Sequence, residues 1–236
     1  MPHAPHRKPS DGAVTLSPRW RGRGWATLHD VSRARDPSEH VFELTGCFGV
    51  RLDEERELEL QEFYGQCLDY FELETGEQPG SNEAKSLLTS LPRGKGHEDK
   101  FVIGLFDAPG HMVGVLDVIR DYPVQGDWYL GLLLLGPSSR GRHLGERVYR
   151  RLEEWVRAES GNAIHIIVQE QNPGALRFWK RMGFQERGMG KQMRKGRERV
   201  FLRMTRELEP APEPSGTFIQ SWLAAWRKAR GVRKGA

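Results

Sequence analysis

Apolar and polar positions follow regular periods from about residue 41 onward and predict strands and helices there. An apolar-rich run over 41–50 predicts a strand, and apolar residues on one helical face over 53–71 predict a single helix. A shorter helix is expected within 75–96, between two loops rich in glycine and proline. Runs over 101–106 and 112–119, joined by the turn-forming sequence DAPG, predict a hairpin.

The next part of the chain predicts a strand, a helix and a second strand. The segment 129–135 is almost wholly apolar, which is typical of a strand covered on both faces. A helix with one apolar face follows and should end before Gly161, ahead of a strand over 164–168. Because a helical crossover of this length connects parallel strands with right-handed geometry, these two strands should be parallel.

A second helix is expected between its N-cap Asn172 and Gly183, with a proline in its first helical position. Two final strands are expected near 184–188 and 200–205. This order of elements predicts one α/β or α+β domain over residues 41–208.

The two ends of the chain differ in composition from the middle. Residues 1–40 are rich in Pro, Gly, Arg, His and Ser without a period, which predicts a disordered extension. Residues 209–236 open with a proline-rich linker and continue with an apolar helix face over 218–226, beside basic residues. Such a basic amphipathic helix can bind a membrane surface or a partner groove, or dock on its own domain or a second subunit.

The net charge of +4 is unevenly distributed. Residues 1–40 contain seven basic and four acidic side chains, and residues 209–236 contain five and two, so each end carries +3. The middle, 41–208, holds 24 basic and 26 acidic side chains and therefore carries −2. Since the basic character belongs to the ends, nucleic acid is not expected as the main ligand.

Several classes of protein are excluded. The longest apolar run, around 132–135, is far shorter than the ~18 residues of a membrane span, and no apolar run follows the basic N-terminus as in a secretory signal. Two cysteines, Cys47 and Cys67, are too few for a disulfide framework and are expected as small buried residues. With scattered histidines, no metal is expected, and the chain should remain in the reducing cytoplasm.

The loop 140–145, between the apolar strand and the following helix, has the composition of an anion-binding site. A helix start leaves backbone N–H groups without intrahelical acceptors, glycines allow close approach, and Arg140 and Arg142 add positive charge. The loop matches neither GxGxxG nor GxxxxGK[ST], so it lacks the residues typical of dinucleotide and P-loop sites. Taken alone, an ordinary tight turn explains it equally well.

Two motifs together resemble the GNAT superfamily of acyl-CoA-dependent N-acyltransferases. RGRHLG at 140–145 is similar to the family motif [QR]-x-x-G-x-[GA], and NPGALRFWKRMGF at 172–184 is similar to N-x-x-A-x-x-F-Y-x-x-x-G-F. Their order and spacing agree with the predicted elements, and the resemblance covers roughly 41–208. It implies a GNAT fold, in which helices flank a mixed, mostly antiparallel central sheet with a splayed parallel strand pair.

The resemblance implies acetyl-CoA as acyl donor. Its pantetheine arm would insert between the splayed strands and pair with the backbone of Leu133 and Leu135, and its pyrophosphate would rest on the loop N–H groups. Asn172 matches the family's asparagine near the pantetheine, although its place as N-cap explains it as well. The residues expected to bind CoA are Leu133, Leu135, Arg140, Gly141, Arg142, His143, Leu144, Gly145, Asn172, Ala175 and Phe178.

Two residues depart from the family pattern. His143 stands where the family usually has the first glycine of the loop, so a side chain lies where the pyrophosphate approaches, while its N–H can still donate. Trp179 stands where many members have a tyrosine that protonates the CoA thiolate. An indole N–H has no accessible pKa and cannot be that acid. Tyr129 is a candidate acid by position alone.

The reaction that the resemblance implies is direct attack of a neutral amine on the acetyl thioester in a ternary complex. It needs a base for the amine proton, N–H groups for the developing oxyanion, and contact between the two substrates. Glu170, at the end of a strand, and Asp117, a charge inside an apolar strand, are the candidate bases. For Asp117, a solvent-facing position or a salt bridge is the alternative.

In this family the acceptor site is built largely from the first helix, the loop after it and the hairpin end. The corresponding residues are acidic and aromatic, which suits a cationic amine, but solvated loop residues would have the same composition. They are Tyr70, Glu72, Glu74, Asp117, Asp121, Tyr122 and Trp128.

The sequence therefore favours an N-acetyltransferase that acts on a primary amine of a small molecule or peptide, with a homodimer and longer acyl groups left open. A catalytically weak or inactive acyl-CoA-binding or interaction module of the same fold is the alternative, because of His143 and Trp179. A third interpretation is an adaptor that binds a membrane or partner through its C-terminal tail.

Overall fold

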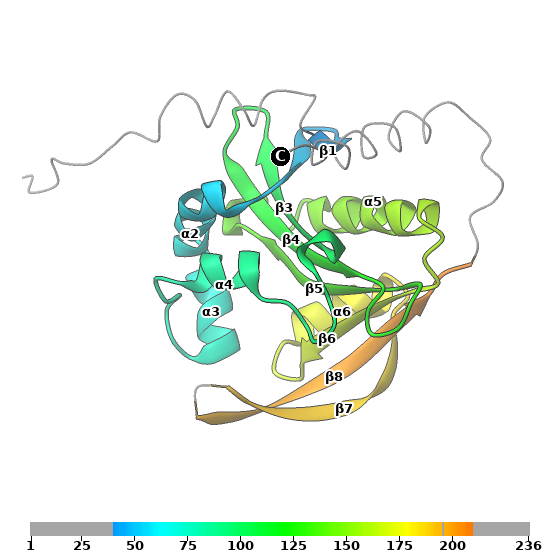
Figure 1. The fold of residues 1–236 in the computed structure, drawn as a ribbon. Helices are drawn as coiled ribbons and strands as arrows, with labels where there is room; N and C mark the ends of the chain where they lie inside the picture. The colour runs from blue at the N-terminus through cyan, green and yellow to red at the C-terminus, as the bar shows by residue number, and fades with distance from the viewer. Residues whose placement is uncertain (1–39, 195, 210–236) are drawn as a thin grey trace, which may run out of the picture.

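The computed structural model describes residues 40–194 and 196–209, which form one eight-stranded sheet flanked by helices (Figure 1). The predicted extension over 1–40, except His40, and the predicted tail over 209–236, except Glu209, lie outside the described residues. The elements are β1 (His40–Leu44), β2 (Cys47–Arg51), η2 (Glu54–Arg56), α2 (Glu57–Gly65), α3 (Leu68–Thr75), α4 (Glu83–Thr89), η3 (His97–Asp99), β3 (Lys100–Asp107), β4 (Met112–Arg120), β5 (Asp127–Leu135), η4 (Pro137–Ser139), α5 (Leu144–Ala158), β6 (Ala163–Gln169), α6 (Pro173–Arg181), β7 (Gln185–Arg194) and β8 (Arg197–Glu207).

The sheet has the strand order β1-β2-β3-β4-β5-β6-β8-β7. The neighbouring strands pair antiparallel except β5 and β6, which are parallel as the crossover through α5 predicts. This mixed, mostly antiparallel sheet with one parallel pair is the predicted fold class. The helices α4, α5 and α6 and the hairpin of β3 and β4 lie close to their predicted positions.

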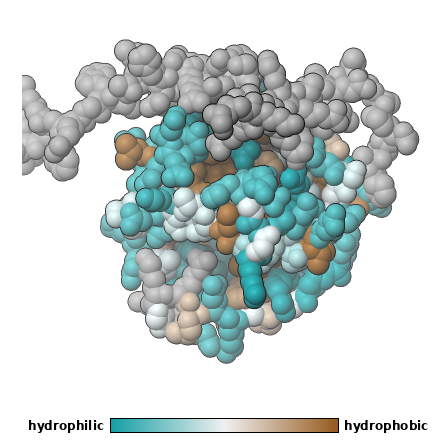
Figure 2. Space-filling view, viewed as in Figure 1, coloured by the Kyte–Doolittle hydropathy of each residue, from teal (hydrophilic) through white to brown (hydrophobic). Residues whose placement is uncertain are grey.

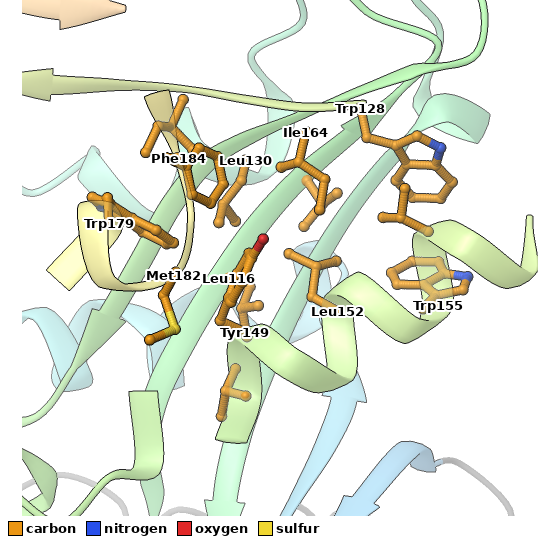
Figure 3. Close-up of a cluster of buried hydrophobic side chains, with 14 of the residues drawn as sticks. Leu116, Trp128, Leu130, Tyr149, Leu152, Trp155, Ile164, Trp179, Met182 and Phe184 are labelled. Atoms are coloured by element: carbon orange, nitrogen blue, oxygen red, sulfur yellow. The ribbon is translucent and has the colours of Figure 1, made fainter. Parts of the chain in front are cut away.

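Helices cover both faces of the sheet and bury an apolar cluster on each. On one face, Tyr149, Leu152 and Trp155 of α5 pack with Trp179 and Met182 toward the sheet (Figure 3). On the other face, α2, α3 and α4 bury a second cluster against β2, β3 and β4. On the side shown in Figure 2, hydrophilic residues predominate and apolar residues form small separate patches.

The predicted strand over 41–50 is two strands, so that prediction was wrong. β1 and β2 form an antiparallel hairpin around Gly46, whose φ of +77° is a left-handed conformation that glycine adopts without steric cost. A Cβ at Gly49 would lie 2.8 Å from the Phe42 ring, so the hairpin also needs a residue without a side chain there. Apolar residues on both sides of the turn gave the appearance of one continuous strand.

The predicted single helix over 53–71 is interrupted. It consists of η2, α2 and α3, with a break at Gln66 and Cys67, where the Cys67 N–H bonds to the Tyr64 carbonyl at 3.0 Å, three residues back. Gly65, a weak helix former, ends α2. The apolar period continues across the break because both helices bury residues on the same face of the sheet, which explains why the sequence pattern shows no interruption.

Strands β5 and β6 pair over a short length and then diverge. Their parallel pairs are Asp127 with Ala163, Trp128 with Ile164, and Tyr129 with His165. Beyond them, β5 stays on β4 and β6 stays on β8. The splayed parallel pair implied by the resemblance is therefore present.

A three-residue clamp holds the strands where they begin to separate. His165 Nε2 lies 2.7 Å from Asp127 Oδ2, and His165 Nδ1 lies 2.9 Å from Thr205 Oγ1. Because these residues belong to β6, β5 and β8, the clamp links three strands at the point of divergence.

The last two strands extend well beyond the predicted 184–188 and 200–205. They form a long hairpin whose polar, exposed positions hide the strand period from the sequence. Both cysteines are free and buried as predicted, and burial raises the pKa of each thiol to about 11. Within the described part of the chain, no helix is both long and apolar enough to cross a membrane.

Candidate functional site

A cavity of about 1350 Å³ occupies the gap between β5 and β6 and continues under α3 and α4. Its walls include 129–135 of β5, 166–169 of β6, the loop before α5 and the start of α6. Small-molecule sites usually measure about 300–1,000 Å³, so this volume has room for two substrates side by side. The strand 129–135 was predicted to be covered on both faces, but Tyr129 and Leu133 contribute to the cavity wall instead.

The backbone of β5 presents an edge to this cavity. Gly136 donates its N–H to the Val113 carbonyl of β4 at 2.9 Å. Because successive strand residues direct their backbone groups to opposite sides, Leu133 and Leu135 direct theirs toward the gap. The Leu135 carbonyl accepts a hydrogen bond from Arg140 Nε at 2.8 Å. An extended ligand can therefore pair with this edge at Leu133.

The loop before α5 forms the narrow end of the cavity. The helix begins at Leu144, and its first backbone bond runs from Arg147 N–H to the His143 carbonyl at 3.1 Å. The N–H groups of Leu144, Gly145 and Glu146 therefore have no acceptor within the helix, and all three residues line the cavity. These donors and the positive end of the helix dipole form an anion site.

The backbone conformation at His143 explains why the family motif has a glycine at this position. Its φ is +58°, a left-handed conformation that glycine adopts more easily than any other residue. The imidazole is 83% exposed, with Nδ1 3.8 Å from Glu146 Oε2. The side chain therefore lies at the rim of the loop and does not fill it.

Of the two loop arginines, Arg140 contributes to the cavity wall, but its guanidinium is bonded to a carboxylate of the protein. Arg140 bonds to Asp69 of α3 through both terminal nitrogens, and this hydrogen bond holds the pKa of Asp69 below its usual range. Its side chain therefore ties α3 to the end of β5 instead of pointing into the loop. Arg142 is exposed and does not contribute to the cavity wall.

The start of α6 supplies the opposite wall of the narrow end. Asn172 accepts the N–H of Ala175 through Oδ1 at 2.9 Å, so it is the helix N-cap as predicted. Both residues line the cavity, as do Phe178 and Trp179. The Trp179 ring packs edge-on against Tyr149 at a centroid distance of 5.6 Å (Figure 3). Trp179 is thus both a core residue and a wall of the cavity.

Two of the candidate catalytic residues lie together at a β-bulge. Asp117 pairs with Leu132 and Val118 with Leu130, so Gly131 is the extra residue of β5. A Cβ at Gly131 would lie 3.0 Å from Asp117 Oδ2 and 3.5 Å from the Tyr129 ring. The bulge therefore brings the Asp117 carboxylate and the Tyr129 ring to one point of the cavity wall.

Asp117 is a buried member of a salt bridge, which was one of its alternatives. Its Oδ1 accepts a hydrogen bond from Lys100 Nζ at 2.7 Å, and both residues line the cavity. Burial raises the pKa of Asp117, and the Lys100 charge opposes this effect. The residue is not solvent-facing, because it is only 8% exposed.

Glu170 does not belong to the cavity. β6 ends at Gln169, and Glu170 is exposed beyond it, with its N–H bonded to the Val200 carbonyl at 3.1 Å. Its side chain contributes nothing to the cavity wall, so the geometry does not support it as a base. The chain turns away immediately after the strand, which position in the sequence does not reveal.

Tyr70 and Glu74 are the predicted acceptor residues, beside Asp117, that line the cavity. Glu74 accepts from Gln169 Nε2 through Oε2 at 2.6 Å and through its carbonyl at 3.2 Å. This contact joins α3 to β6 across the cavity. Sequence reasoning missed Gln169, Lys100 and the α4 residues of this wall, because single polar residues at strand ends and in short helices have no distinctive spacing.

The other predicted acceptor residues lie outside the cavity wall. Trp128 is 1% exposed and packs between Phe101 and Trp155 in the core, because its side chain is on the α5 face of β5. Asp121 accepts the Gly126 N–H at 2.8 Å inside the turn between β4 and β5. Two further residues are outside it as well, namely Glu72 and Tyr122.

Tyr122 packs against Tyr129, a residue of the cavity wall. Its ring meets the Tyr129 ring edge-on at a centroid distance of 5.6 Å. It therefore supports a cavity-lining residue without contributing to the wall itself. Among the residues that the structure describes, no group of three or more His, Cys, Asp or Glu side chains could hold a metal ion.

The combination of a splayed parallel pair, an N–H-lined loop at a helix start and a cavity along the open strand edge defines a class of acyl-CoA-dependent transferases. A profile of the acetyltransferase (GNAT) family matches residues 52–184, more than half of the chain. The chain belongs to this family.

Solved structures share the fold at low sequence identity. An acetyltransferase from Thermus thermophilus is 22% identical, with a TM-score of 0.56 over 72% of this chain and 99% of that one. The ribosomal-protein-S18-alanine N-acetyltransferase from Escherichia coli is 13% identical, with a TM-score of 0.53 over 72% and 99%. A spermidine N-acetyltransferase from Vibrio cholerae, in complex with CoA and spermine, is 15% identical, with a TM-score of 0.56 over 70% and 96%. No curated protein matches this sequence.

Proposed function

We propose that this protein is an N-acetyltransferase that moves an acetyl group from acetyl-CoA to a primary amine of a small molecule or peptide. The observation that carries the proposal is one continuous cavity of about 1350 Å³. It joins the strand gap and anion loop of a CoA site to a second chamber under α3 and α4. Because both substrates fit at once, the reaction is direct attack in a ternary complex, without an acyl-enzyme.

In this proposal the donor lies along the diverging strands. The pantetheine arm pairs with the backbone edge at Leu133, and the pyrophosphate accepts from the N–H groups of Leu144, Gly145 and Glu146. Asn172 offers its amide N–H₂ to the arm while its oxygen remains the cap of α6. Acetyl-CoA supplies the activated acetyl group.

The residues at the bulge perform the proton transfers. Asp117 Oδ2 faces the cavity and accepts the proton of the attacking amine, directly or through a water. Backbone N–H groups at the bulge stabilise the developing oxyanion. Tyr129, beside the same bulge, is the candidate donor to the departing thiolate, because Trp179 cannot provide a proton.

The acceptor chamber favours an amine that approaches as a cation. The carboxylates of Glu74, Glu83 and Asp117 and the rings of Tyr70 and Tyr129 line it. Carboxylates and aromatic faces both attract ammonium groups. The related fold from Vibrio cholerae was solved with spermine and CoA, which agrees with an amine acceptor. A cytoplasmic location fits the two free cysteines, and a homodimer remains a proposal for sedimentation to test.

A non-catalytic acyl-CoA-binding module is the second candidate, and one observation favours it. Trp179 is locked in the core where many family members place the tyrosine acid. Such a module would bind acetyl-CoA but transfer nothing.

Two measurements test the proposal and separate it from this alternative. Acetyl-CoA at 100 times its Kd should stabilise the fold by about 2.7 kcal/mol in thermal unfolding. Free thiol should then be released in the presence of a panel of primary amines, and tertiary amines of similar charge are the matched control. Stabilisation without amine-dependent thiol release would leave the binding module, and the absence of stabilisation would contradict both candidates.

A further inference from the structure

A buried ion pair lies in the wall of the acceptor chamber. Lys100 is the first residue of β3, and its Nζ lies 2.7 Å from Oδ1 of Asp117 in the middle of β4. The two side chains are only 4% and 11% exposed. Both nevertheless line the cavity, so the pair is shielded from bulk water and borders the chamber.

Stability does not account for this pair. Removing an ammonium and a carboxylate from water costs free energy that their attraction at best offsets, and apolar residues of similar volume are often as stable. The residues paired with them across β3 and β4 are apolar and buried, namely Ile119 opposite Lys100 and Val102 opposite Asp117. An apolar pair at these two positions would therefore be expected to give a fold of similar stability.

The geometry of the carboxylate indicates a different role. Lys100 occupies Oδ1, while Oδ2 lies beside Gly131 at the bulge, where β5 is exposed to the cavity. A carboxylate held by one oxygen has a fixed orientation, and its second oxygen points to a fixed place. In the proposed function, that place is where the amine meets the thioester.

We propose that Lys100 is a positioning residue, which holds Asp117 through Oδ1 so that Oδ2 faces the attacking amine. This inference rests on the proposed function. Lys100 touches neither the donor nor the acceptor in this arrangement. It acts through Asp117, by orienting it and by favouring its ionised form.

The groups that surround Asp117 determine in which direction its pKa shifts when Lys100 is replaced. Tyr64 from α2, Lys100 from β3 and Tyr129 from β5 face it, and Glu74 of α3 and Glu83 of α4 line the same chamber. The positive charge among them belongs to Lys100, which opposes the rise in the pKa of Asp117 that burial causes. Removing this charge raises the pKa further, so more of the carboxylate is protonated at a given pH.

The decisive experiment compares the pH profiles of Lys100→Met and the unchanged protein. When the pKa of a base rises by about one pH unit, activity below that pKa falls roughly tenfold. We expect the acidic limb of kcat/KM to move to higher pH by about that amount or more, with a lower plateau at high pH because the carboxylate is no longer held in place. Lys100→Arg keeps the charge and should restore the limb. An acidic limb that does not move overturns the proposal.

Lys95→Met is the matched control. Lys95 forms a similar pair with Asp99, Nζ to Oδ2 at 3.1 Å, but neither residue lines the cavity. Its profile should follow that of the unchanged protein. A shift equal to that of Lys100→Met would overturn the specific role of Lys100.

A second readout does not depend on turnover. The carboxyl ¹³C signal of Asp117 should titrate at higher pH in Lys100→Met, and in Lys100→Gln if the methionine variant unfolds. An unchanged titration overturns the proposal even when the enzyme is active. If the unchanged protein releases no thiol with any amine, the proposed function is overturned instead. As a control for folding, acetyl-CoA should stabilise the variants as much as it stabilises the unchanged protein.

Discussion

His143 adopts a backbone conformation that its side chain disfavours, at the start of the helix that forms the anion loop. A non-glycine residue in the left-handed region costs on the order of 1 kcal/mol, because its Cβ crowds the neighbouring carbonyl. The ring is exposed at the rim, and no tight packing compensates for this cost. Strain at such a position is typical of loops shaped for a ligand.

Replacing His143 by glycine should therefore stabilise the protein. We expect His143→Gly to raise the free energy of unfolding by up to about 1 kcal/mol in urea denaturation. It should also lower the Kd of acetyl-CoA, since no side chain remains beside the pyrophosphate. His111→Gly is the control, because His111 is similarly exposed and its φ is not positive. A gain of the same size in the control would contradict the argument from backbone strain.

At the scale of elements, the N-cap of α6 has one observed role and one proposed role. Asn172 caps the helix through Oδ1, and its amide nitrogen remains to donate to a pantetheine. The sequence could not separate these roles because the N-cap of α6 is also a wall of the cavity. Substitutions that keep one role and remove the other can separate the two.

Asn172→Asp keeps the capping oxygen and loses the amide donor, while Asn172→Ala loses both. We expect the alanine variant to lose about 1 kcal/mol in the free energy of unfolding and the aspartate variant to lose little. If Asn172 binds the pantetheine, isothermal titration will show weaker acetyl-CoA binding in both variants. Unchanged affinity in Asn172→Asp would leave the capping role alone.

At the scale of the molecule, ion pairs connect the helix layer to the sheet. Glu153 of α5 lies 2.9 Å from Arg157 Nη2 and 3.6 Å from Arg206 Nη2 of β8. Burial tends to raise the pKa of Glu153, but hydrogen bonds from Arg157 and Tyr149 outweigh it, so the pKa lies below its usual range. A carboxyl with a lowered pKa in the folded state stabilises the fold above its unfolded pKa, and this stability is lost as the pH falls.

Unfolding measured as a function of pH should show this contribution. The free energy of unfolding should fall below about pH 4.5, and Glu153→Gln should show a smaller fall because its side chain has no proton to gain. Glu154→Gln is the control and should follow the unchanged protein, because Glu154 is 64% exposed and its pair with Arg151 contributes little. Equal slopes for all three proteins would contradict the role of Glu153.

The sequence by itself determined the features that depend on local order along the chain. The loop before α5, the N-cap at Asn172, the crossover and the parallel pair follow from residues close together in sequence, because backbone geometry and capping are local. The motifs at 140–145 and 172–184 indicate the family. These features carry the donor half of the proposed site.

Only the tertiary structure decided which side chains share the cavity. Trp128 and Tyr129 are neighbours in sequence, yet one enters the core and the other the cavity wall, because successive strand residues face opposite sides of the sheet. Glu170 lies outside the site because the chain turns after β6. Lys100 lines the site and is paired there with Asp117, which is 17 residues away in sequence. Contacts between strands depend on register and on the bulge at Gly131, and neither has a local signature.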